Sequence, residues 1–230
     1  LFDSGRTAIY AALRALDVKE GDEVILQACT CIVVTNAITQ MKATPVYVDI
    51  TPDCVLDPID LAKKVTEKTR VIIVQHGFAI SVDAQEIKDR YAQQGIRIIE
   101  DCALSFGAKI HGKAVGTIGD IAIVSFGSDK VISSVRGGAA ITSLPQYAKA
   151  LASFEQTLPE VSRKKIIQSL LQPLLFSIGK PLYGLSIGKW LLAFAKQSGM
   201  VGRIIYEPEM KGLPLPFYPA KYPNVLAALV

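Results

Sequence analysis

The chain has 230 residues, of which 50% are hydrophobic, and this is enough for one large domain or two small ones with a real core. The net charge of +4 comes from scattered residues without a basic stripe, which argues against nucleic acid as a partner. Four cysteines have neither the paired spacing of zinc sites nor the density of a disulfide scaffold, which favours free thiols in a reducing cytoplasm: Cys29, Cys31, Cys54 and Cys102.

Short β-rich runs alternate with amphipathic helical stretches through the first two thirds of the chain, a rhythm typical of βαβ units. One helix is predicted to open at Ser4-Gly5-Arg6-Thr7, and others cover about 32–42, 58–66 and 84–94. The strand runs are apolar almost throughout, as expected when helices cover both faces of a parallel sheet: 23–26, 45–48, 71–74, 96–99, 121–124 and 139–142. The pattern predicts a three-layer α/β/α fold with a mostly parallel sheet.

Two charged residues, Asp101 and Lys130, follow successive apolar runs of this sheet. Ligands collect at the carboxyl ends of parallel strands, so residues at these ends are candidates for chemistry. An acid and a lysine at neighbouring strand ends can hold pyridoxal phosphate, the acid on the pyridine nitrogen and the lysine by a covalent bond. Taken singly, Asp101 is more often a helix cap and Lys130 a solvated surface charge, so the case depends on their neighbours.

Several polar residues near the same strand ends have both a structural and a ligand-binding interpretation. Ser125 carries a hydroxyl into an apolar run and needs a partner, which is either backbone or a phosphate oxygen. The helix start at Ser4 suits a phosphate as well as it suits a simple N-cap. His76 at another strand end more often satisfies a loop carbonyl than a ligand, and His111 lies in a predicted hairpin over 109–113.

The order and spacing of several motifs between residues 3 and 143 resemble the DegT/DnrJ/StrS family of pyridoxal-phosphate-dependent sugar aminotransferases. This resemblance implies the large domain of fold-type-I aminotransferases followed by a small carboxy-terminal domain, in a homodimer. The amino-terminal arm and most of the small domain are expected to be missing from this sequence. The motifs are Ser4-Gly5-Arg6-Thr7-Ala8, Gly21-Asp22-Glu23-Val24-Ile25, Pro45-Val46-Tyr47-Val48-Asp49-Ile50, Glu100-Asp101-Cys102-Ala103, Gly119-Asp120, Ser125-Phe126 and Lys130.

The resemblance also implies roles for individual residues. Lys130 matches the lysine that bonds to the cofactor, and Asp101 matches the acid that keeps the pyridine nitrogen protonated. The phosphate cup corresponds to Ser125, Gly5, Arg6 and Thr7.

Four positions depart from the family pattern. Cys31 replaces a common aromatic residue that stacks on the cofactor ring, and Leu104 replaces a common Gln or His near the cofactor's phenolic oxygen or the substrate. Arg136 stands where many relatives have Glu, and Arg6 replaces the usual Thr of the phosphate segment. These departures bear more on the identity of the substrate than on the identity of the cofactor.

By this resemblance, we expect transamination of a keto-sugar with an amino-acid donor such as glutamate. In the leading interpretation the keto-sugar is linked to a nucleotide. The product would serve amino-sugar or polysaccharide biosynthesis in the cytoplasm. The alternative is a regulatory or binding protein that keeps the scaffold with weakened catalysis, in view of Cys31 and Leu104. The 230 residues alone are expected to show little or no turnover.

The character of the sequence changes near residue 145. We expect residues 1–145 to form the cofactor-binding core and residues 146–230 to form a helical extension leading toward the small domain. The apolar stretch 166–195 predicts two helices joined near Gly179-Lys180-Pro181, and its longest uncharged run of 14 residues is shorter than the ~20 needed to span a bilayer. A buried helical pair or a partner surface is favoured over contact with a membrane surface. Prolines between 208 and 223 predict an extended crossing, after which a helix starts at residue 224.

Overall fold

Six strands form the central sheet in the computed structural model, which describes residues 1–77, 82–202 and 219–229. The strands lie side by side in the order β2-β1-β3-β4-β7-β8; the first five are parallel, and β8 runs antiparallel to β7. The prediction of a mostly parallel sheet is confirmed. The bounds are β1 (Glu23–Gln27), β2 (Thr44–Val48), β3 (Thr69–Gln75), β4 (Arg97–Asp101), β7 (Ile121–Ser125) and β8 (Gly138–Ile141).

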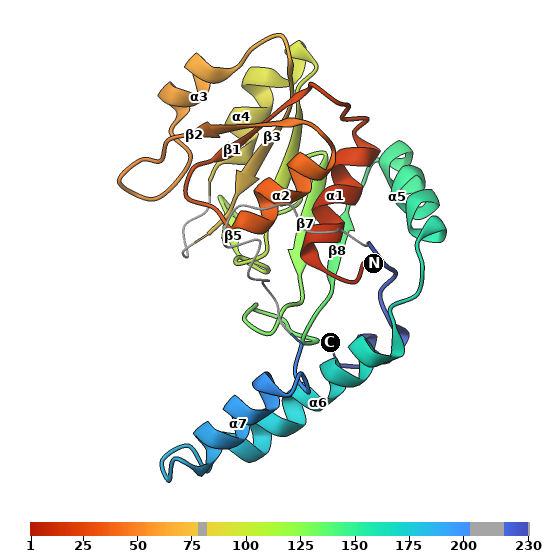
Figure 1. The fold of residues 1–230 in the computed structure, drawn as a ribbon. Helices are drawn as coiled ribbons and strands as arrows, with labels where there is room; N and C mark the ends of the chain where they lie inside the picture. The colour runs from red at the N-terminus through yellow and green to blue at the C-terminus, as the bar shows by residue number, and fades with distance from the viewer. Residues whose placement is uncertain (78–81, 203–218, 230) are drawn as a thin grey trace.

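Helices cover both faces of this sheet, which gives the three layers seen in Figure 1. Side chains alternate along each strand, so Val24 and Leu26 of β1 join the core beneath one helical layer while Ile25 joins the core beneath the other. The first layer contains α1 (Gly5–Ala15), α2 (Ile32–Gln40) and α5 (Pro145–Thr157), and the second contains α3 (Pro58–Lys64) and α4 (Ala84–Tyr91).

The helix starts follow from local side-chain caps. The Ser4 Oγ accepts a hydrogen bond from the Thr7 N–H at 3.2 Å, and the Asp57 carboxylate accepts one from the Ile59 N–H at 2.7 Å. Asp83 caps α4 in the same way. Each cap satisfies an N–H group that has no partner inside its helix, so these starts could be read from sequence. Past Tyr91, α4 continues as the short 3₁₀ helix η1 (Ala92–Gln94).

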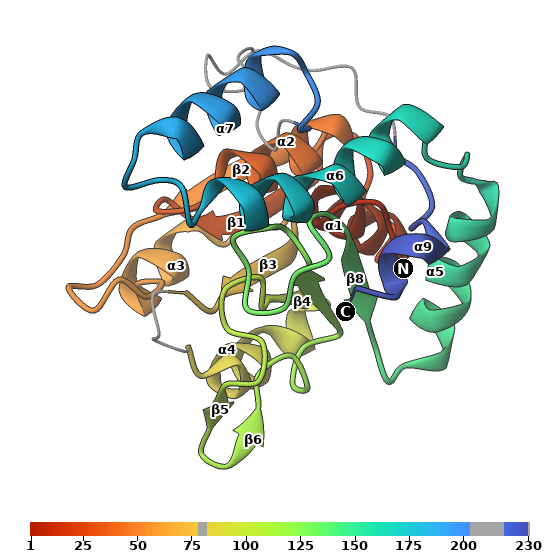
Figure 2. The same cartoon turned by 90° about the horizontal axis from the view of Figure 1, so that it is seen from below.

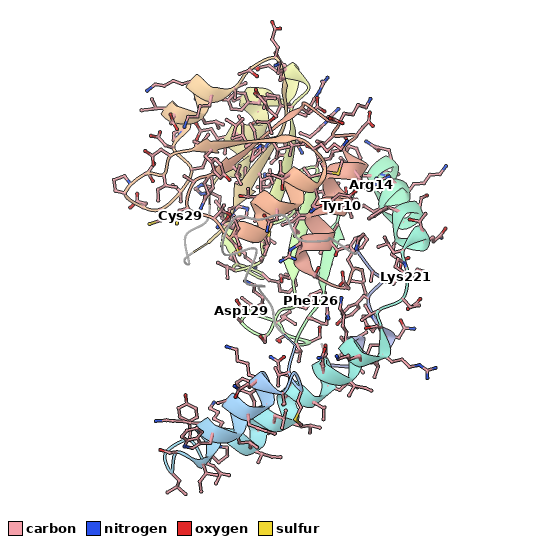
Figure 3. The ribbon with its side chains drawn as sticks, viewed as in Figure 1. Tyr10, Arg14, Cys29, Phe126, Asp129 and Lys221 are labelled. Atoms are coloured by element: carbon pink, nitrogen blue, oxygen red, sulfur yellow. The ribbon has the colours of Figure 1, made fainter. Side chains whose placement is uncertain are left out.

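One helix of the α/β body, α5, was not anticipated as a separate element. Its Leu151 is buried in the same core as α1, and Figure 3 shows Tyr10 and Arg14 of α1 on the side that faces α5. The Arg14 guanidinium lies 5.0 Å from the centroid of the Phe154 ring, and the Tyr10 ring lies 5.9 Å from it. Burial of a leucine side chain stabilises the fold by about 1.5–3 kcal/mol, so α5 contributes to the stability of the α/β body.

A small hairpin and a contact between the start of the chain and two later segments complete the α/β body. The hairpin consists of β5 (Lys109–Ile110) and β6 (Lys113–Ala114), which confirms the predicted hairpin with His111 exposed at its turn. Phe2 pairs with Gly138 of β8 through two backbone hydrogen bonds of 2.9 and 3.0 Å, and the Asp3 N–H donates to the Ala220 carbonyl. The start of the chain, β8 and the segment near residue 220 therefore meet at one place.

Two helices project from the α/β body as an antiparallel pair: α6 (Arg163–Gly179) and α7 (Ile187–Gln197) (Figure 1). They confirm the predicted helices of the stretch 166–195, and Gly179 allows close approach because a Cβ there would lie 2.9 Å from Leu192. The pair is not buried, since α6 and α7 each have only two buried residues, so the expectation of a buried pair is wrong for the described chain.

Within the described residues, none of the helices combines the length and apolar character that crossing a bilayer requires. A last short helix, α9 (Asn224–Ala227), confirms the helix start predicted at residue 224. Most of the predicted extended crossing, including Pro208, Pro214 and Pro216, lies outside the described residues. The division at residue 145 stays a prediction.

Candidate functional site

A cavity of about 470 Å³ opens at the carboxyl ends of β3, β4 and β7, beside the first turn of α1. Figure 2 views this end of the sheet, with α6 running across in front of it. All eight residues that the sequence singled out as site residues line this one cavity: Gly5, Arg6, Thr7, Cys31, Asp101, Leu104, Ser125 and Lys130. They come from four separate segments of the chain, 5–7, 31, 101–104 and 125–130, so the tertiary fold brings the predicted residues together.

Asp101 is the last residue of β4 and is almost completely buried. Its Oδ1 accepts a hydrogen bond from the Ala103 N–H at 3.0 Å, and no helix follows, so helix capping does not account for the residue. Burial raises the pKa of Asp101, although the Ala103 N–H and the positive charge of Lys130 oppose this. A cation inside the cavity would therefore be stabilised by this carboxylate and would in turn favour its ionised form.

Lys130 lies in the loop after β7, where its backbone N–H donates to the Gly127 carbonyl at 3.1 Å. Its Nζ lies 3.4 Å from the Asp129 carboxylate, and only 21% of the Lys130 side chain is exposed while it lines the cavity. The interpretation of Lys130 as a freely solvated charge is therefore wrong. Figure 3 labels Phe126 and Asp129 in the loop that carries Lys130 below the sheet.

The first turn of α1 lies directly against the end of β7. A Cβ added at Gly5 would lie 3.0 Å from the Ser125 Oγ, so only glycine allows the helix start to approach that hydroxyl so closely. The first turn of a helix also has N–H groups without intrahelical acceptors and the positive end of the helix dipole. This corner of the cavity therefore suits an anion such as a phosphate.

Two positions at which the sequence departs from the family pattern line other parts of the cavity. Cys31 is the exposed N-cap residue of α2, and Leu104 is 41% exposed. Neither side chain offers an aromatic ring or a strong hydrogen-bonding group to a ligand.

A buried pair behind the cavity, His76 and Glu100, was not foreseen from sequence. The His76 Nε2 lies 3.0 Å from Glu100 Oε2, and its Nδ1 accepts from the Val82 N–H at 3.3 Å, so His76 is satisfied by a carboxylate rather than by the expected loop carbonyl. Burial raises the pKa of Glu100, but hydrogen bonds from His76 and from the N–H groups of Gly119, Gly116 and Ile118 together hold it below its usual value. Glu100 thus fixes both the cavity-lining His76 and the loop before β7.

A second unforeseen network connects Arg136 with the residues preceding α1. The Arg136 guanidinium lies 3.1 Å from Asp3 Oδ2, and the Thr7 hydroxyl donates to Asp3 Oδ1 at 2.6 Å. Because Asp3 is buried, its charge needs these partners. The sequence shows Arg136 only as a departure from the family pattern, whereas the structure pairs it with Asp3 and so neutralises that buried charge.

The helix α6 also lines the cavity, through Lys165, Ser169 and Gln172. These residues lie at i, i+4 and i+7 and share one face of the helix. The spacing was visible in the sequence, but nothing in it indicated that this face would meet the strand ends.

The model of the DegT/DnrJ/EryC1/StrS aminotransferase family matches residues 2–169. The chain belongs to this family. The match covers the sheet, α1 to α5 and the first part of α6, and so contains every strand end that lines the cavity.

Individual relatives agree with the family match. The chain is 38% identical over 149 residues to the L-glutamine:2-deoxy-scyllo-inosose aminotransferase of Streptomyces kanamyceticus, covering 64% of this chain and 35% of that protein. It is 38% identical to the GDP-perosamine synthase of Escherichia coli O157:H7, over 61% of this chain and 39% of that protein. A protein named pleiotropic regulatory protein, from Geobacillus stearothermophilus, is also 38% identical, over 64% of this chain and 40% of that protein.

Among solved structures, the chain is similar to NtdA of Bacillus subtilis with bound pyridoxamine phosphate. The TM-score is 0.61 at 30% identity, and the match covers 67% of this chain and 35% of that one. The chain thus spans between about a third and two fifths of the length of these proteins.

Proposed function

We propose that this chain binds pyridoxal phosphate and serves in the transamination of a nucleotide-linked keto-sugar. The amino donor would be an amino acid such as glutamate. The reaction would belong to amino-sugar or polysaccharide biosynthesis, carried out by a cytoplasmic homodimer. The observation that carries the proposal is the joint position of Asp101, Lys130 and the first turn of α1 around one cavity. Family membership and the bound cofactor of the Bacillus subtilis relative support it.

The cavity fits such a cofactor in size and in the chemistry of its walls. Its volume of about 470 Å³ lies within the range of small-molecule sites, about 300–1,000 Å³. The acid, the amine and the anion-binding corner correspond to three polar groups of the cofactor, which are the ring nitrogen, the aldehyde and the phosphate. Pyridoxal phosphate, when bound, supplies an electron sink for negative charge that develops on the carbon next to an amino group.

Asp101 would hold a proton on the ring nitrogen. Its carboxylate is buried, where an ion pair with a cationic ring is stronger than in water. The Ala103 N–H fixes the orientation of the carboxylate by donating to Oδ1, so the other oxygen is left to face the ring nitrogen.

Lys130 would bind the aldehyde carbon through Nζ and, once released by the incoming donor, would move a proton between the donor's α-carbon and the cofactor. The lysine accepts this proton as a neutral amine and delivers it from the ammonium form. The Asp129 carboxylate lies 3.4 Å from this amine, so we expect the contact between Asp129 and Lys130 to break once Nζ bonds to the aldehyde carbon.

The phosphate would be bound by Ser125 and by the segment Gly5, Arg6 and Thr7. The absence of a Cβ at Gly5 brings the helix N–H groups close to the Ser125 hydroxyl, so both can contact one anion. Arg6 adds a guanidinium, which binds phosphate with two parallel hydrogen bonds where geometry allows. Cys31 and Leu104 would flank the ring without the stacking or hydrogen bonding that the family pattern leads us to expect at these positions.

The test is a cofactor titration followed by half-reactions. We expect the protein to develop the near-visible absorbance of enzyme-bound pyridoxal phosphate, and Lys130→Ala to lose it. In the full-length protein, addition of glutamate or glutamine should then convert the bound cofactor to its amine form, which a panel of keto-sugars should reverse. Absence of cofactor binding by the unmodified protein would refute the proposal.

The second candidate is a regulatory or binding protein built on the same scaffold. It is favoured by the residues at Cys31 and Leu104 and by the name of the Geobacillus relative. Cofactor binding without conversion by any amino donor would support this candidate over the enzyme.

A further inference from the structure

The projecting pair α6 and α7, here called the α6–α7 hairpin (residues 163–197), has a one-sided charge distribution. Between residues 161 and 202 the sequence contains no Asp or Glu. It does contain six basic residues: Arg163, Lys164, Lys165, Lys180, Lys189 and Lys196. Three of the six lie in the first turn of α6, where positive charge opposes the helix dipole and costs stability. Such a placement indicates a role other than stabilising the helix.

The outer face of α6 is apolar and exposed. Ile167, Leu174 and Ile178 lie at i, i+7 and i+11, so they share one stripe, and each is more than half exposed. Arg163 and Lys164 lie four and three residues before Ile167 and therefore flank the start of this stripe. The cavity-lining residues of α6 lie on the opposite face of the helix.

The second helix and the turn before it add exposed aromatic and aliphatic side chains. Ile187, Trp190 and Phe194 lie at i, i+3 and i+7 of α7 and are 58%, 77% and 64% exposed. The turn exposes Tyr183 and Leu185, at 51% and 71%. Trp and Tyr are the residues that concentrate at the interface between lipid headgroups and acyl chains.

We propose that the α6–α7 hairpin binds the surface of a membrane that contains anionic phospholipids. The apolar stripes would enter the boundary between headgroups and acyl chains while the basic residues other than the cavity-lining Lys165 contact the lipid phosphates. The helices are too short and too charged to cross the bilayer, so the chain would lie on it. The cavity would remain accessible because it lies on the other face of α6.

Charge complementarity favours this occupant over a second copy of the chain. In a symmetric contact between two hairpins, the basic residues of one copy other than the cavity-lining Lys165 would meet the same residues of the other, with no acidic residue of either hairpin to pair with them. Anionic headgroups instead provide opposite charge to every basic residue they meet. The proposal does not depend on the proposed transaminase function.

The chain provides its own probe, because Trp190 is its only tryptophan. We expect its fluorescence to shift to shorter wavelength with vesicles containing phosphatidylglycerol, to be quenched by brominated acyl chains, and to change little with pure phosphatidylcholine. Ile187→Ser/Phe194→Ser keeps the probe and should abolish the shift. Ile59→Ser/Ile141→Ser, which changes two exposed isoleucines of the α/β body, should keep it.

A second pair of variants tests the charge. Arg163→Gln/Lys164→Gln should weaken vesicle binding by about 25-fold, since each basic residue near an anionic surface contributes about fivefold. Lys109→Gln/Lys113→Gln removes the same charge from the exposed β5–β6 hairpin and should leave binding unchanged. Circular dichroism would establish that each variant is folded.

Three results would overturn the proposal. They are no spectral shift with anionic vesicles, an equal shift with neutral vesicles, and a shift that follows protein concentration without lipid. The last result would assign the hairpin to contact between copies of the chain.

Discussion

Replacement of Glu100 by glutamine tests how much the buried hydrogen bonds behind the cavity stabilise the fold. Glu100 Oε1 accepts from the N–H groups of Ile118 and Gly119 at 2.8 and 2.6 Å, and Oε2 accepts from Gly116 at 2.9 Å and His76 at 3.0 Å. Glutamine has nearly the same shape, but one oxygen becomes an NH₂ group that can only donate. Either orientation of the amide therefore places a donor against two donors.

The cost follows from counting the donors that lose an acceptor. With the NH₂ toward the loop, Ile118 and Gly119 are left unsatisfied. With the NH₂ on the other side, Gly116 is unsatisfied, and His76 can accept from it only if the ring proton moves from Nε2 to Nδ1, which removes the acceptor of the Val82 N–H. Each buried unsatisfied group costs about 1–3 kcal/mol, so Glu100→Gln should reduce the free energy of unfolding by about 2–6 kcal/mol.

Thermal unfolding followed by circular dichroism would measure this loss, expected as a fall in Tm of about 5–20 °C for a chain of this size. The matched control is Glu86→Gln, an exposed glutamate paired with Arg90, for which we expect a change below about 0.5 kcal/mol. If Glu100→Gln lies within about 1 kcal/mol of the unmodified protein, the reasoning on this network is refuted.

The same variant has a defined pH dependence. Because the pKa of Glu100 is lowered on folding, the unfolded chain binds more protons, and the stabilisation is fully present above the usual value of 4.5. It is lost as pH falls through the lowered pKa of the folded state. The stability difference between Glu100→Gln and the unmodified protein should therefore shrink below about pH 4.5.

Two further substitutions test the strand ends around the cavity. Asp101→Asn should raise the Tm of the cofactor-free chain at neutral pH, because burial raises the pKa of Asp101 and its ionisation above the usual value of 3.8 costs folding free energy. In an absorbance titration the same variant should bind pyridoxal phosphate about 10- to 100-fold more weakly, since a charge-assisted hydrogen bond contributes about 1.5–3 kcal/mol. A lower Tm of Asp101→Asn, or an unchanged affinity for the cofactor, would contradict these expectations. Gly138→Ala should destabilise the chain by about 1–3 kcal/mol in urea unfolding, because its Cβ would lie 2.6 Å from the backbone nitrogen of Gly5. Gly184→Ala, whose Cβ meets nothing within 4 Å, is the control, and equal stability of the two variants would count against the close approach of β8 and α1.

The sequence alone determined the layers, most element starts and the positions of the two central charges. The strands can be recognised as continuous apolar runs because helices cover both of their faces. The helix starts can be recognised at Ser4, Asp57 and Asp83 because a cap acts on N–H groups within a few residues. Asp101 and Lys130 could be named because, in a parallel sheet, residues at the strand ends share one edge. Each of these signals is local, or repeats with the period of its element.

Only the tertiary structure decided which distant groups meet. Arg136 pairs with Asp3 across 133 positions of sequence, and Glu100 pairs with His76 across 24. The hydrophobic period of α6 predicted a helix but not that Lys165 would line the cavity while Ile167 would be exposed on the opposite side. Partner choice for a buried charge depends on which surfaces the packed elements bring within hydrogen-bonding distance, and no periodicity along the chain encodes that distance.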